Sequence, residues 1–238
     1  MERLRESSTE MRAANIARVM TSEFLNKIAQ ELKRHIGDAE AIFMPAVFGL
    51  LNDEAVTELR SLVRVPLYFV PTMPASVPGV RTQIQLKSYF QRLGGTYLLG
   101  DSVKEGIFEN NRLTAIRTIN HEDMEFRADN FILATGSFFG HGLIASQDRI
   151  YEPIFGLDII ADRQRSDWYN KDLFAHQPYM GYGVRTDNKL RCSIDGSKIE
   201  NLYAAGSLLA SQNSLEEGTG GGVAITTALF VADEIINA

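Results

Sequence analysis

The sequence lacks the residues that mark several classes of protein. It holds a single cysteine, Cys192, so neither an intrachain disulfide nor a Cys-x-x-Cys redox pair can form. Long apolar runs are missing too, since stretches such as residues 41–44 and 131–134 are far shorter than a bilayer requires. Residues 1–10 are charged and polar and contain no signal-peptide core. These absences lead us to expect a cytoplasmic protein.

Positive charge is also scarce, with 24 lysines and arginines against 30 aspartates and glutamates, for a formal net charge of −6. Binding to nucleic acid depends on a cationic surface, so nucleic acid is not an expected partner. Direct adhesion to anionic lipid head groups is disfavoured for the same reason. If the protein works at a membrane, we expect a partner to hold it there. The four isolated histidines and one cysteine suggest no metal site.

The first third of the chain alternates helical and strand patterns. Thr21 or Ser22 can cap a helix, and its apolar face would hold Leu25, Ile28, Ala29, Leu32 and Ile36. Residues 41–44 are typical of a buried strand, a second helix begins at Asn52 or Asp53, and residues 65–70 form another strand. This order predicts an α/β layer.

A proline-rich stretch, residues 71–78, follows, and we interpret it as a domain junction or a substrate-side loop. The next helix carries Leu86, Tyr89, Phe90 and Leu93 on one face and stops at residues 94–95, a glycine pair. Residues 96–128 predict strands and tight turns, with residues 109–111 at a hairpin tip. Residues 138–201 are irregular and rich in aromatic and polar side chains, which is typical of a lid.

Two strand ends carry the pattern of a ligand site. Residues 202–207 predict a strand ending in small residues, followed by a loop over residues 218–222 and an apolar helix over residues 223–236. Four of the five loop residues are glycine, so backbone N–H groups and the positive end of the helix can approach a phosphate or a reduced flavin. Residues 130–137 predict a second buried strand that delivers small residues at its carboxyl end, where ligands of open α/β sheets bind. Each feature alone also fits a plain glycine turn, and together they favour a flat cofactor.

These features resemble the C-terminal portion of flavoproteins with a dinucleotide-binding fold. Longer stretches, namely residues 10–18, 44–50, 71–81, 134–139, 152–158 and 220–223, are similar to the B subunits of anaerobic, quinone-linked glycerol-3-phosphate dehydrogenases. The resemblance covers residues 7–236. It implies an incomplete FAD/NAD(P)-binding, Rossmann-like α/β flavoprotein fold with an α/β substrate or cap part. It is incomplete because no G-x-G-x-x-G turn lies near the start, so we expect the first strand–helix–strand unit to be missing.

The resemblance implies four parts. Residues 1–78 are expected to form a substrate or cap part, residues 79–137 and 200–238 the flavin-binding part, and residues 138–199 a cap or insertion. The cofactor is FMN or FAD, and we predict that it is held by Val103, Ala134, Thr135, Gly136, Ser137, Gly206, Ser207, Gly218, Gly220, Gly221, Gly222 and Val223.

The implied reaction oxidises sn-glycerol 3-phosphate to dihydroxyacetone phosphate during anaerobic respiration, with electrons passed to a quinone. It needs cations for the phosphate and a base for the hydroxyl proton, and our candidates are Arg12 and Arg81 for the phosphate and His141 for the proton. The implied partners are a sister flavoprotein, the A subunit, and an iron–sulfur protein, the C subunit, which anchors the complex to the cytoplasmic face of the inner membrane.

Two other functions remain open. Residues 202–223 also fit a flavoprotein of the fumarate-reductase or succinate-dehydrogenase type, which a comparison of dicarboxylates with glycerol 3-phosphate would separate. The missing N-terminal motif instead favours a non-catalytic structural subunit with a degenerate flavin site. Such a subunit would be colourless and would still assemble with flavoprotein partners.

Overall fold

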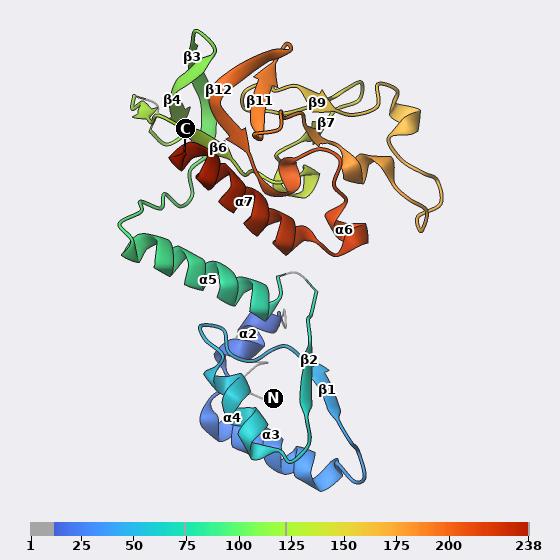
Figure 1. The fold of residues 1–238 in the computed structure, drawn as a ribbon. Coiled ribbons are helices and arrows are strands. Elements are labelled where there is room, and N and C mark those ends of the chain that lie inside the picture. Colours follow the sequence, from blue (N-terminus) through green and yellow to red (C-terminus); the bar gives the residue numbers. More distant parts are fainter. Residues whose placement is uncertain (1–11, 74, 122, 238) are drawn as a thin grey trace. The chain divides into compact units, whose positions relative to one another are not determined.

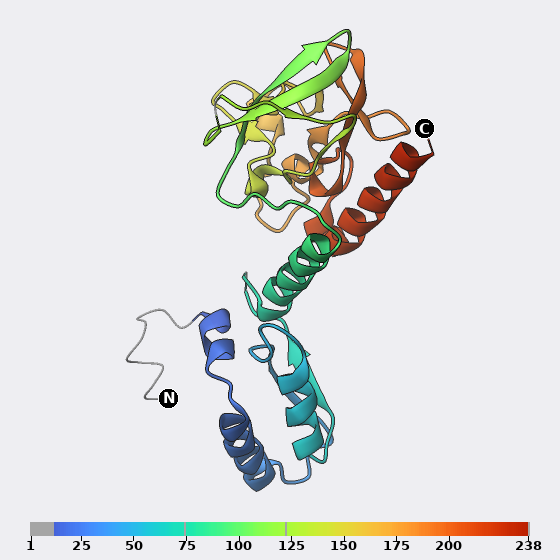
Figure 2. The ribbon, with the colours of Figure 1, turned by 90° about the vertical axis from the view of Figure 1, so that its left-hand side faces the viewer.

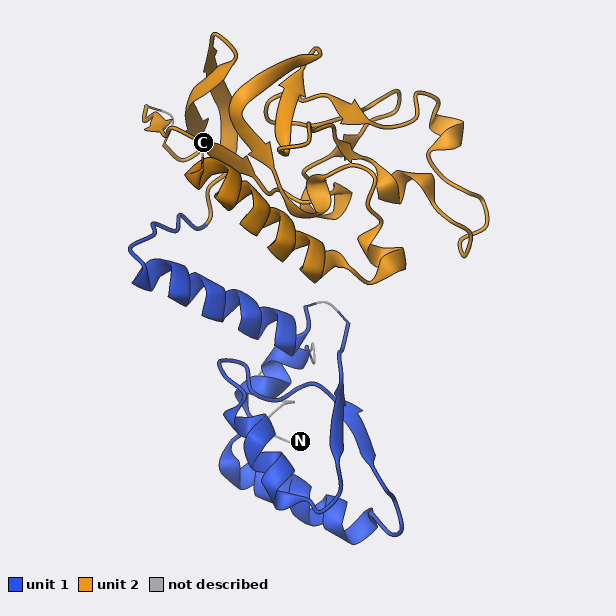
Figure 3. Ribbon diagram, in the orientation of Figure 1, with its two compact units in different colours: residues 1–99 blue, residues 100–238 orange. Residues whose placement is uncertain are grey.

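The structure is a computed structural model, and it describes residues 12–73, 75–121 and 123–237. The chain divides into two compact units, residues 1–99 and residues 100–238 (Figure 3). Helices and strands occur in both, which agrees with the α/β class expected from the sequence. The boundary between the units falls inside residues 79–137, which we expected to belong to one flavin-binding part, and that division into parts stays a prediction.

The helices at the start of unit 1 follow the sequence pattern. Helix α2 (Ala13–Arg18) is short, and α3 (Ser22–His35) begins where the hydroxyl of Thr21 accepts a hydrogen bond from the N–H of Phe24 at 3.4 Å. Acidic Glu23 lies in the first turn of α3 and three basic residues lie in its last turn, so the charges match the helix dipole. The predicted cap and helix are confirmed.

A strand–helix–strand motif completes the core of unit 1. Strand β1 (Ile42–Pro45), helix α4 (Glu54–Leu62) and strand β2 (Leu67–Val70) follow one another, and β1 pairs with β2 in parallel. Helices α3 and α4 lie side by side (Figure 2). They bury apolar side chains against the strands in one cluster made of Leu25, Ala29, Phe48, Leu59, Val63 and Leu67.

Helix α5 (Val77–Arg92) is the last helix of unit 1. Ser76 accepts a hydrogen bond from the N–H of Gly79 at 3.3 Å, and a proline stands in the first turn, so the start of the helix is well defined. The chain leaves the helix at Gly94, which has a φ of 89°. The apolar face predicted for this helix is exposed in the described chain, at Leu86, Tyr89, Phe90 and Leu93.

Unit 2 begins with a hairpin. Strands β3 (Val103–Glu109) and β4 (Arg112–Thr118) are antiparallel, and β5 (Phe126–Arg127) joins the free edge of β4 (Figure 1). The turn places Asn110 at a φ of 47° and Asn111 at 61°. Asparagine tolerates this left-handed conformation, and tight hairpin turns require it, so the predicted tip is confirmed.

A second sheet of unit 2 has the order β11-β12-β6. Its strands are β6 (Phe131–Leu133), β11 (Arg191–Ile194) and β12 (Ser197–Ala204); β11 pairs with β12 antiparallel, whereas β6 pairs with β12 in parallel. Two-residue strands pair as β7 (Ile144–Ala145) with β8 (Ile150–Tyr151) and as β9 (Ile159–Ile160) with β10 (Gly183–Val184). The chain ends in helices α6 (Ser214–Glu217) and α7 (Gly220–Ile236).

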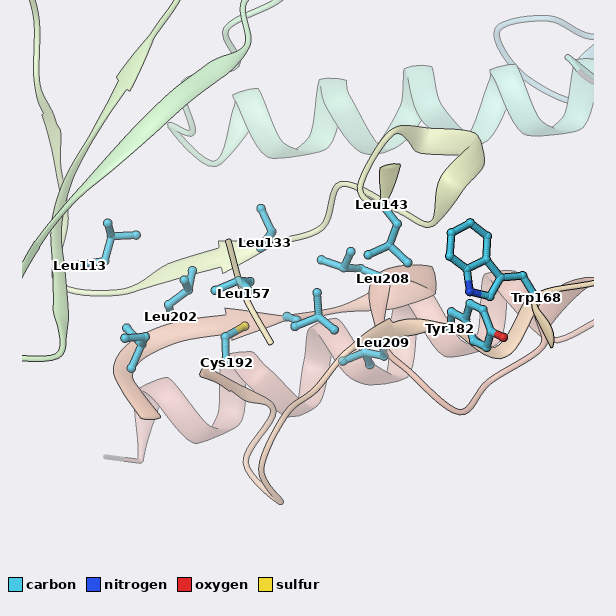
Figure 4. Packing of buried hydrophobic residues seen from close by; sticks show 13 residues of the cluster. Leu113, Leu133, Leu143, Leu157, Trp168, Tyr182, Cys192, Leu202, Leu208 and Leu209 are labelled. Atoms are coloured by element: carbon cyan, nitrogen blue, oxygen red, sulfur yellow. The ribbon is translucent and has the colours of Figure 1, made fainter. Parts of the chain in front are cut away.

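One hydrophobic core joins these pieces of unit 2 (Figure 4). Residues 138–199, the predicted cap, supply part of it, including Leu143, Leu157, Trp168 and Tyr182. This stretch therefore packs against β6 and β12 within one unit, and its role as a cap stays a prediction. The side chain of Asn201 is buried and bonds the N–H and carbonyl of Leu113 at 2.9 and 2.8 Å, which ties β12 to β4.

Candidate functional site

The two strand ends singled out in the sequence lie next to each other. Leu133 is the register partner of Ala204, at the carboxyl ends of parallel strands β6 and β12. The N–H of Ala205 donates to the carbonyl of Leu133 at 3.0 Å, so the pairing continues one residue beyond the strand. Both chain segments therefore leave the sheet at the same edge, where ligands of open α/β sheets bind.

A glycine-rich turn follows β6. Gly136 has a φ of 79°, and a Cβ on Gly142 would lie 1.8 Å from the carbonyl oxygen of Gly136. Only glycine fits at Gly142, because even the smallest side chain would overlap that backbone. The N–H groups of Gly140 and Gly142 both donate to the carbonyl of Ser137, at 3.1 and 3.0 Å. The turn thus folds back on itself and holds Ser137 at the edge of the sheet.

Helix α7 begins earlier than we expected from the sequence. We predicted a loop through Gly222 and a helix from Val223, but the helix begins at Gly220, so the prediction was wrong by one turn. Glycine destabilises the interior of a helix. It is tolerated in the first turn, where the N–H groups have no hydrogen-bond partner within the helix. The cap residue Thr219 makes no side-chain hydrogen bond to that turn. An added Cβ would meet no other described atom within 4 Å at Gly221 or Gly222.

One cleft of about 320 Å³ connects the strand ends with the start of α7. Ser137 from the β6 turn, Ser207 from the β12 turn and Gly220 from the helix all line it, so the shared cleft that the flavin interpretation requires exists. Its volume lies at the low end for small-molecule sites. The remaining lining residues are Phe138, Phe139, Tyr179, Met180, Gln212, Asn213, Ser214, Leu215 and Ala224.

Hydrogen bonds connect Asn213, which lines this cleft, to Glu216 and through that side chain to His176. Asn213 is buried, and its side chain accepts from the N–H of Glu216 at 3.2 Å and donates to that residue's carboxylate at 2.7 Å. The same carboxylate contacts Nδ1 of His176 at 2.8 Å. His176 is therefore bound to α6 and does not line the cleft.

The chemistry of the cleft fits a flat, partly polar ligand such as a flavin ring. Aromatic and methionine side chains form apolar walls, and serine, glutamine and asparagine side chains add hydrogen-bonding groups. The first-turn N–H groups of α7 add donors and the positive end of the helix dipole. At the end of β6, the hydroxyl of Thr135 is buried without a hydrogen-bond partner among the described residues, and such an atom costs free energy unless a ligand satisfies it.

The predicted cofactor residues divide into two groups. Ser137, Ser207 and Gly220 line the cleft, while the others on the same two turns and helix do not: Ala134, Thr135, Gly136, Gly206, Gly218, Gly221, Gly222 and Val223. Val103 lies at the start of β3 and is also absent from the lining. The roles of all these residues stay predictions.

Sequence reasoning missed most of the cleft walls. Phe138, the adjacent pair Tyr179 and Met180, and Ala224 come from three separate parts of the chain, and no pattern in the sequence connects them. One signal was available: Asn213 precedes the sequence Ser-Leu-Glu-Glu, which is typical of a helix start.

The three catalytic and substrate candidates lie elsewhere. His141 is exposed, has a φ of 62° and follows the short 3-10 helix η1 (Phe138–Gly140). Arg81 on α5 donates from Nη1 to the carbonyls of Gly49 and Asn52, at 2.9 and 3.2 Å, so it holds a loop of unit 1. Arg12 precedes α2 and lines a cleft of unit 1. Their functional roles stay predictions.

No helix in the described ranges is long and apolar enough to cross a membrane. Likewise, the described residues contain no group of three or more His, Cys, Asp or Glu side chains that could hold a metal ion.

Comparison with known proteins identifies the family of the chain. Residues 2–223 match the model of a family described as FAD binding domain. The chain is 42% identical over 239 residues to the B subunit of the anaerobic glycerol-3-phosphate dehydrogenase of Yersinia enterocolitica, and the match covers 100% of this chain and 56% of that protein. The B subunit of the Haemophilus influenzae enzyme is 42% identical over 99% of this chain and 56% of its own length. This chain thus spans about half the length of the curated relatives it matches. No solved structure matches it.

Proposed function

This chain belongs to the FAD binding domain family, and from that premise we propose that it is part of a flavin-dependent subunit of an anaerobic glycerol-3-phosphate dehydrogenase. The reaction would be the oxidation of sn-glycerol 3-phosphate to dihydroxyacetone phosphate, with electrons passed to a quinone. The observation that carries the proposal is the single cleft shared by Ser137, Ser207 and Gly220. The names of the relatives supply the substrate.

The chain's own residues would bind and orient the cofactor, FAD or FMN. Phe138, Tyr179 and Met180 would pack on the ring and keep water from its faces. The N–H groups of the first turn of α7 would donate to an electron-rich edge and favour negative charge there. When bound, the flavin supplies an acceptor for a hydride from the substrate carbon.

The substrate roles follow from the chemistry of a phosphate ester and a hydroxyl group. Arg12 and Arg81 are the proposed phosphate ligands, because a guanidinium group can donate two parallel hydrogen bonds to a phosphate. His141 is the proposed base, because a ring nitrogen of histidine can accept the proton of a substrate hydroxyl group. Its exposure leaves it accessible to substrate.

The relatives are each named as one lettered subunit of an enzyme, which implies an assembly with further subunits. We propose two partners for this chain, a sister flavoprotein (the A subunit) and an iron–sulfur protein (the C subunit). The iron–sulfur partner would hold the assembly on the cytoplasmic face of the inner membrane and carry the electrons to the quinone.

The experiment that tests the cleft titrates the purified chain with FMN and, separately, with FAD. Binding is measured as quenching of the flavin fluorescence. Ala224→Phe should abolish quenching, because the ring would fill the cleft that Ala224 lines. Ala228→Phe is the matched control: it makes the same substitution on α7 at an exposed position outside the lining. Quenching that survives Ala224→Phe, or a native chain that binds neither flavin, would contradict the proposal.

The reaction itself is tested with the protein assembled with its partner subunits. Flavin absorbance should bleach on addition of glycerol 3-phosphate and should not bleach with succinate. Bleaching by succinate alone would instead support a dehydrogenase for dicarboxylates.

A further inference from the structure

Two neighbouring apolar side chains project into solvent from one loop of unit 2. The loop, residues 168–177, connects the 3-10 helices η2 (Arg165–Asp167) and η3 (Pro178–Gly181). At its turn Leu173 is 80% exposed and Phe174 is 95% exposed, and neither belongs to the hydrophobic core of the unit. Exposed loop tips usually carry small or polar residues. A large apolar pair at this position therefore indicates a contact with another molecule.

The 168–177 loop has a defined shape. The N–H of Tyr179 donates to the carbonyl of Trp168 at 2.9 Å and closes the loop at its base. Inside the loop, the side chain of Gln177 is buried. It accepts from the N–H of Asn170 at 2.9 Å and donates to the carbonyl of Asp172 at 2.8 Å. This one amide thus holds the two arms of the loop together.

The turn that carries the apolar pair is also hydrogen-bonded. The carboxylate of Asp172 accepts from the N–H of Phe174 at 3.0 Å, and its carbonyl accepts from the N–H of Ala175 at 3.2 Å. Beyond the turn, Nδ1 of His176 contacts the carboxylate of Glu216 at 2.8 Å and connects the loop to α6. The apolar pair is therefore presented in one arrangement, and a partner that binds it need not order the loop.

The charge of the loop does not suit a membrane. Apart from His176, its charged residues are Lys171 and Asp172, which are both exposed and have opposite signs. Anionic lipid head groups attract clusters of several lysines and arginines. A neutral loop on a chain with a formal net charge of −6 lacks that attraction.

The shape of the loop does not suit a second copy of the same surface. A stable protein interface covers about 800 Å² on each partner, and two side chains at a loop tip supply far less. Two projecting tips also do not complement each other. The surface that fits is a concave, apolar pocket on a different protein. The polar rim of such a pocket would match the opposite charges of Lys171 and Asp172.

From these observations we propose that Leu173 and Phe174 insert into an apolar pocket of a partner protein. Lys171 and Asp172 would lie at the rim of the contact. The identity of that partner as the A or the C subunit rests on the proposed function, whereas the docking tip itself rests on the geometry of the loop.

The test measures the affinity of the purified full chain for the purified A subunit and, separately, for the purified C subunit. One of the two should bind the native chain. The double variant Leu173→Ser with Phe174→Ser should weaken that binding by about tenfold or more, the usual effect of truncating central interface residues. Flavin quenching should stay the same, because neither side chain lines the cleft at the start of α7.

A matched double variant controls for the loss of exposed apolar surface. Phe43→Ser with Leu99→Ser makes the same two substitutions in unit 1, at side chains that are 71% and 78% exposed, and should keep the native affinity. Gln177→Leu leaves the apolar pair in place but removes the amide that holds the loop, so it should weaken partner binding several-fold. Circular dichroism would verify that each variant is folded.

Native affinity in the variant that lacks Leu173 and Phe174 would overturn the proposal. Binding of neither subunit by the native chain would also overturn it, and so would equal losses in the two double variants. Native affinity in Gln177→Leu would overturn the role of the loop's shape.

Two further measurements test the other possible occupants of the tip. The chain is sedimented with vesicles of equal parts phosphatidylcholine and phosphatidylglycerol, and its self-association is measured by sedimentation velocity. Vesicle binding or self-association that the Leu173 and Phe174 double variant abolishes would assign the tip to lipid or to a second copy, and would overturn the proposal.

Flavin quenching on the same samples separates the docking tip from the proposed function. A chain that binds flavin but keeps native partner affinity without Leu173 and Phe174 would contradict the docking tip alone. A chain that docks through these side chains but binds no flavin would support the tip and contradict the flavin cleft.

Discussion

The hydroxyl oxygen of Thr227 accepts a hydrogen bond from the N–H of Gly206 at 2.9 Å, across 21 residues of sequence. The same hydroxyl contacts the carbonyl of Val223 at 2.6 Å. Gly206 is buried, has a φ of 71° and lies two residues beyond the end of β12. This hydrogen bond joins the segment after β12 to helix α7, and both contribute residues to the cleft lined by Ser137, Ser207 and Gly220.

Replacing Thr227 with valine should destabilise unit 2 by about 1–3 kcal/mol, because the buried N–H of Gly206 loses its partner. Thr226→Val is the control, since Thr226 is exposed and its hydroxyl bonds only carbonyls of its own helix among the described residues. The measurement is urea unfolding followed by the fluorescence of Trp168, the chain's one tryptophan, which is buried in unit 2. Equal midpoints for the two variants would show that the contact contributes nothing.

Gly142→Ala should also destabilise unit 2. Its Cβ would lie 1.8 Å from the oxygen of Gly136 and 2.7 Å from the hydroxyl of Thr135, so the turn after β6 must open. Overpacking of this kind costs about 1–3 kcal/mol. Gly181→Ala should leave the stability nearly unchanged, because a Cβ added there would meet no other described atom within 4 Å. Thermal unfolding compares the two, and a native-like midpoint for Gly142→Ala would contradict the close approach of the backbone in this turn.

The thiol of Cys192 should be unreactive in the folded protein. Its side chain is fully buried, and burial, followed by the negative charges of Glu152 and Asp187, raises the pKa of the thiol to about 12. Because the thiolate is the reactive form, a thiol reagent at a mildly alkaline pH of about 8 should label the native chain slowly and the urea-unfolded chain rapidly. Fast, stoichiometric labelling without denaturant would show that this core opens.

Asp187 should make stability depend on acid pH. Burial favours its neutral form, but hydrogen bonds from the backbone and side chain of Arg191 and from the N–H of Lys189 outweigh burial and hold the pKa of Asp187 below its usual value. The pKa is thus lower in the folded state, so the stabilisation is present at neutral pH and is lost as the pH falls below about 4.

Asp187→Asn should lower the free energy of unfolding near neutral pH. The free energy of unfolding of this variant should also fall less than that of the native chain as the pH is lowered from about 5 to about 3, a window around the usual aspartate pKa of roughly 4. Asp233→Asn, at an exposed position of α7, is the control and should keep the native pH dependence. Urea unfolding at each pH measures both. A native pH profile in Asp187→Asn would mean that this carboxylate is not the group responsible.

The sequence by itself determined the local elements. The Thr21 cap began a helix, the two asparagines after Glu109 made a tight turn, and the small residues after β6 and β12 ended strands as expected. Such features depend on a few neighbouring residues, whose side chains and allowed φ values act within one turn or strand. The start of α7 was misjudged because glycine, a poor helix former, is tolerated in a first turn whose N–H groups need no helical partner.

Only the tertiary structure decided how these pieces form sites. The parallel pairing of β6 with β12 and the contact of Thr227 with Gly206 each join segments that are far apart in the chain. The aromatic walls from Phe138 and Tyr179, and the positions of Arg12 and Thr72 in one cleft, depend in the same way on packing. Local propensity does not favour one pairing of distant chain segments over another. Packing does, because burial and hydrogen bonding stabilise a contact only when both partners are in place.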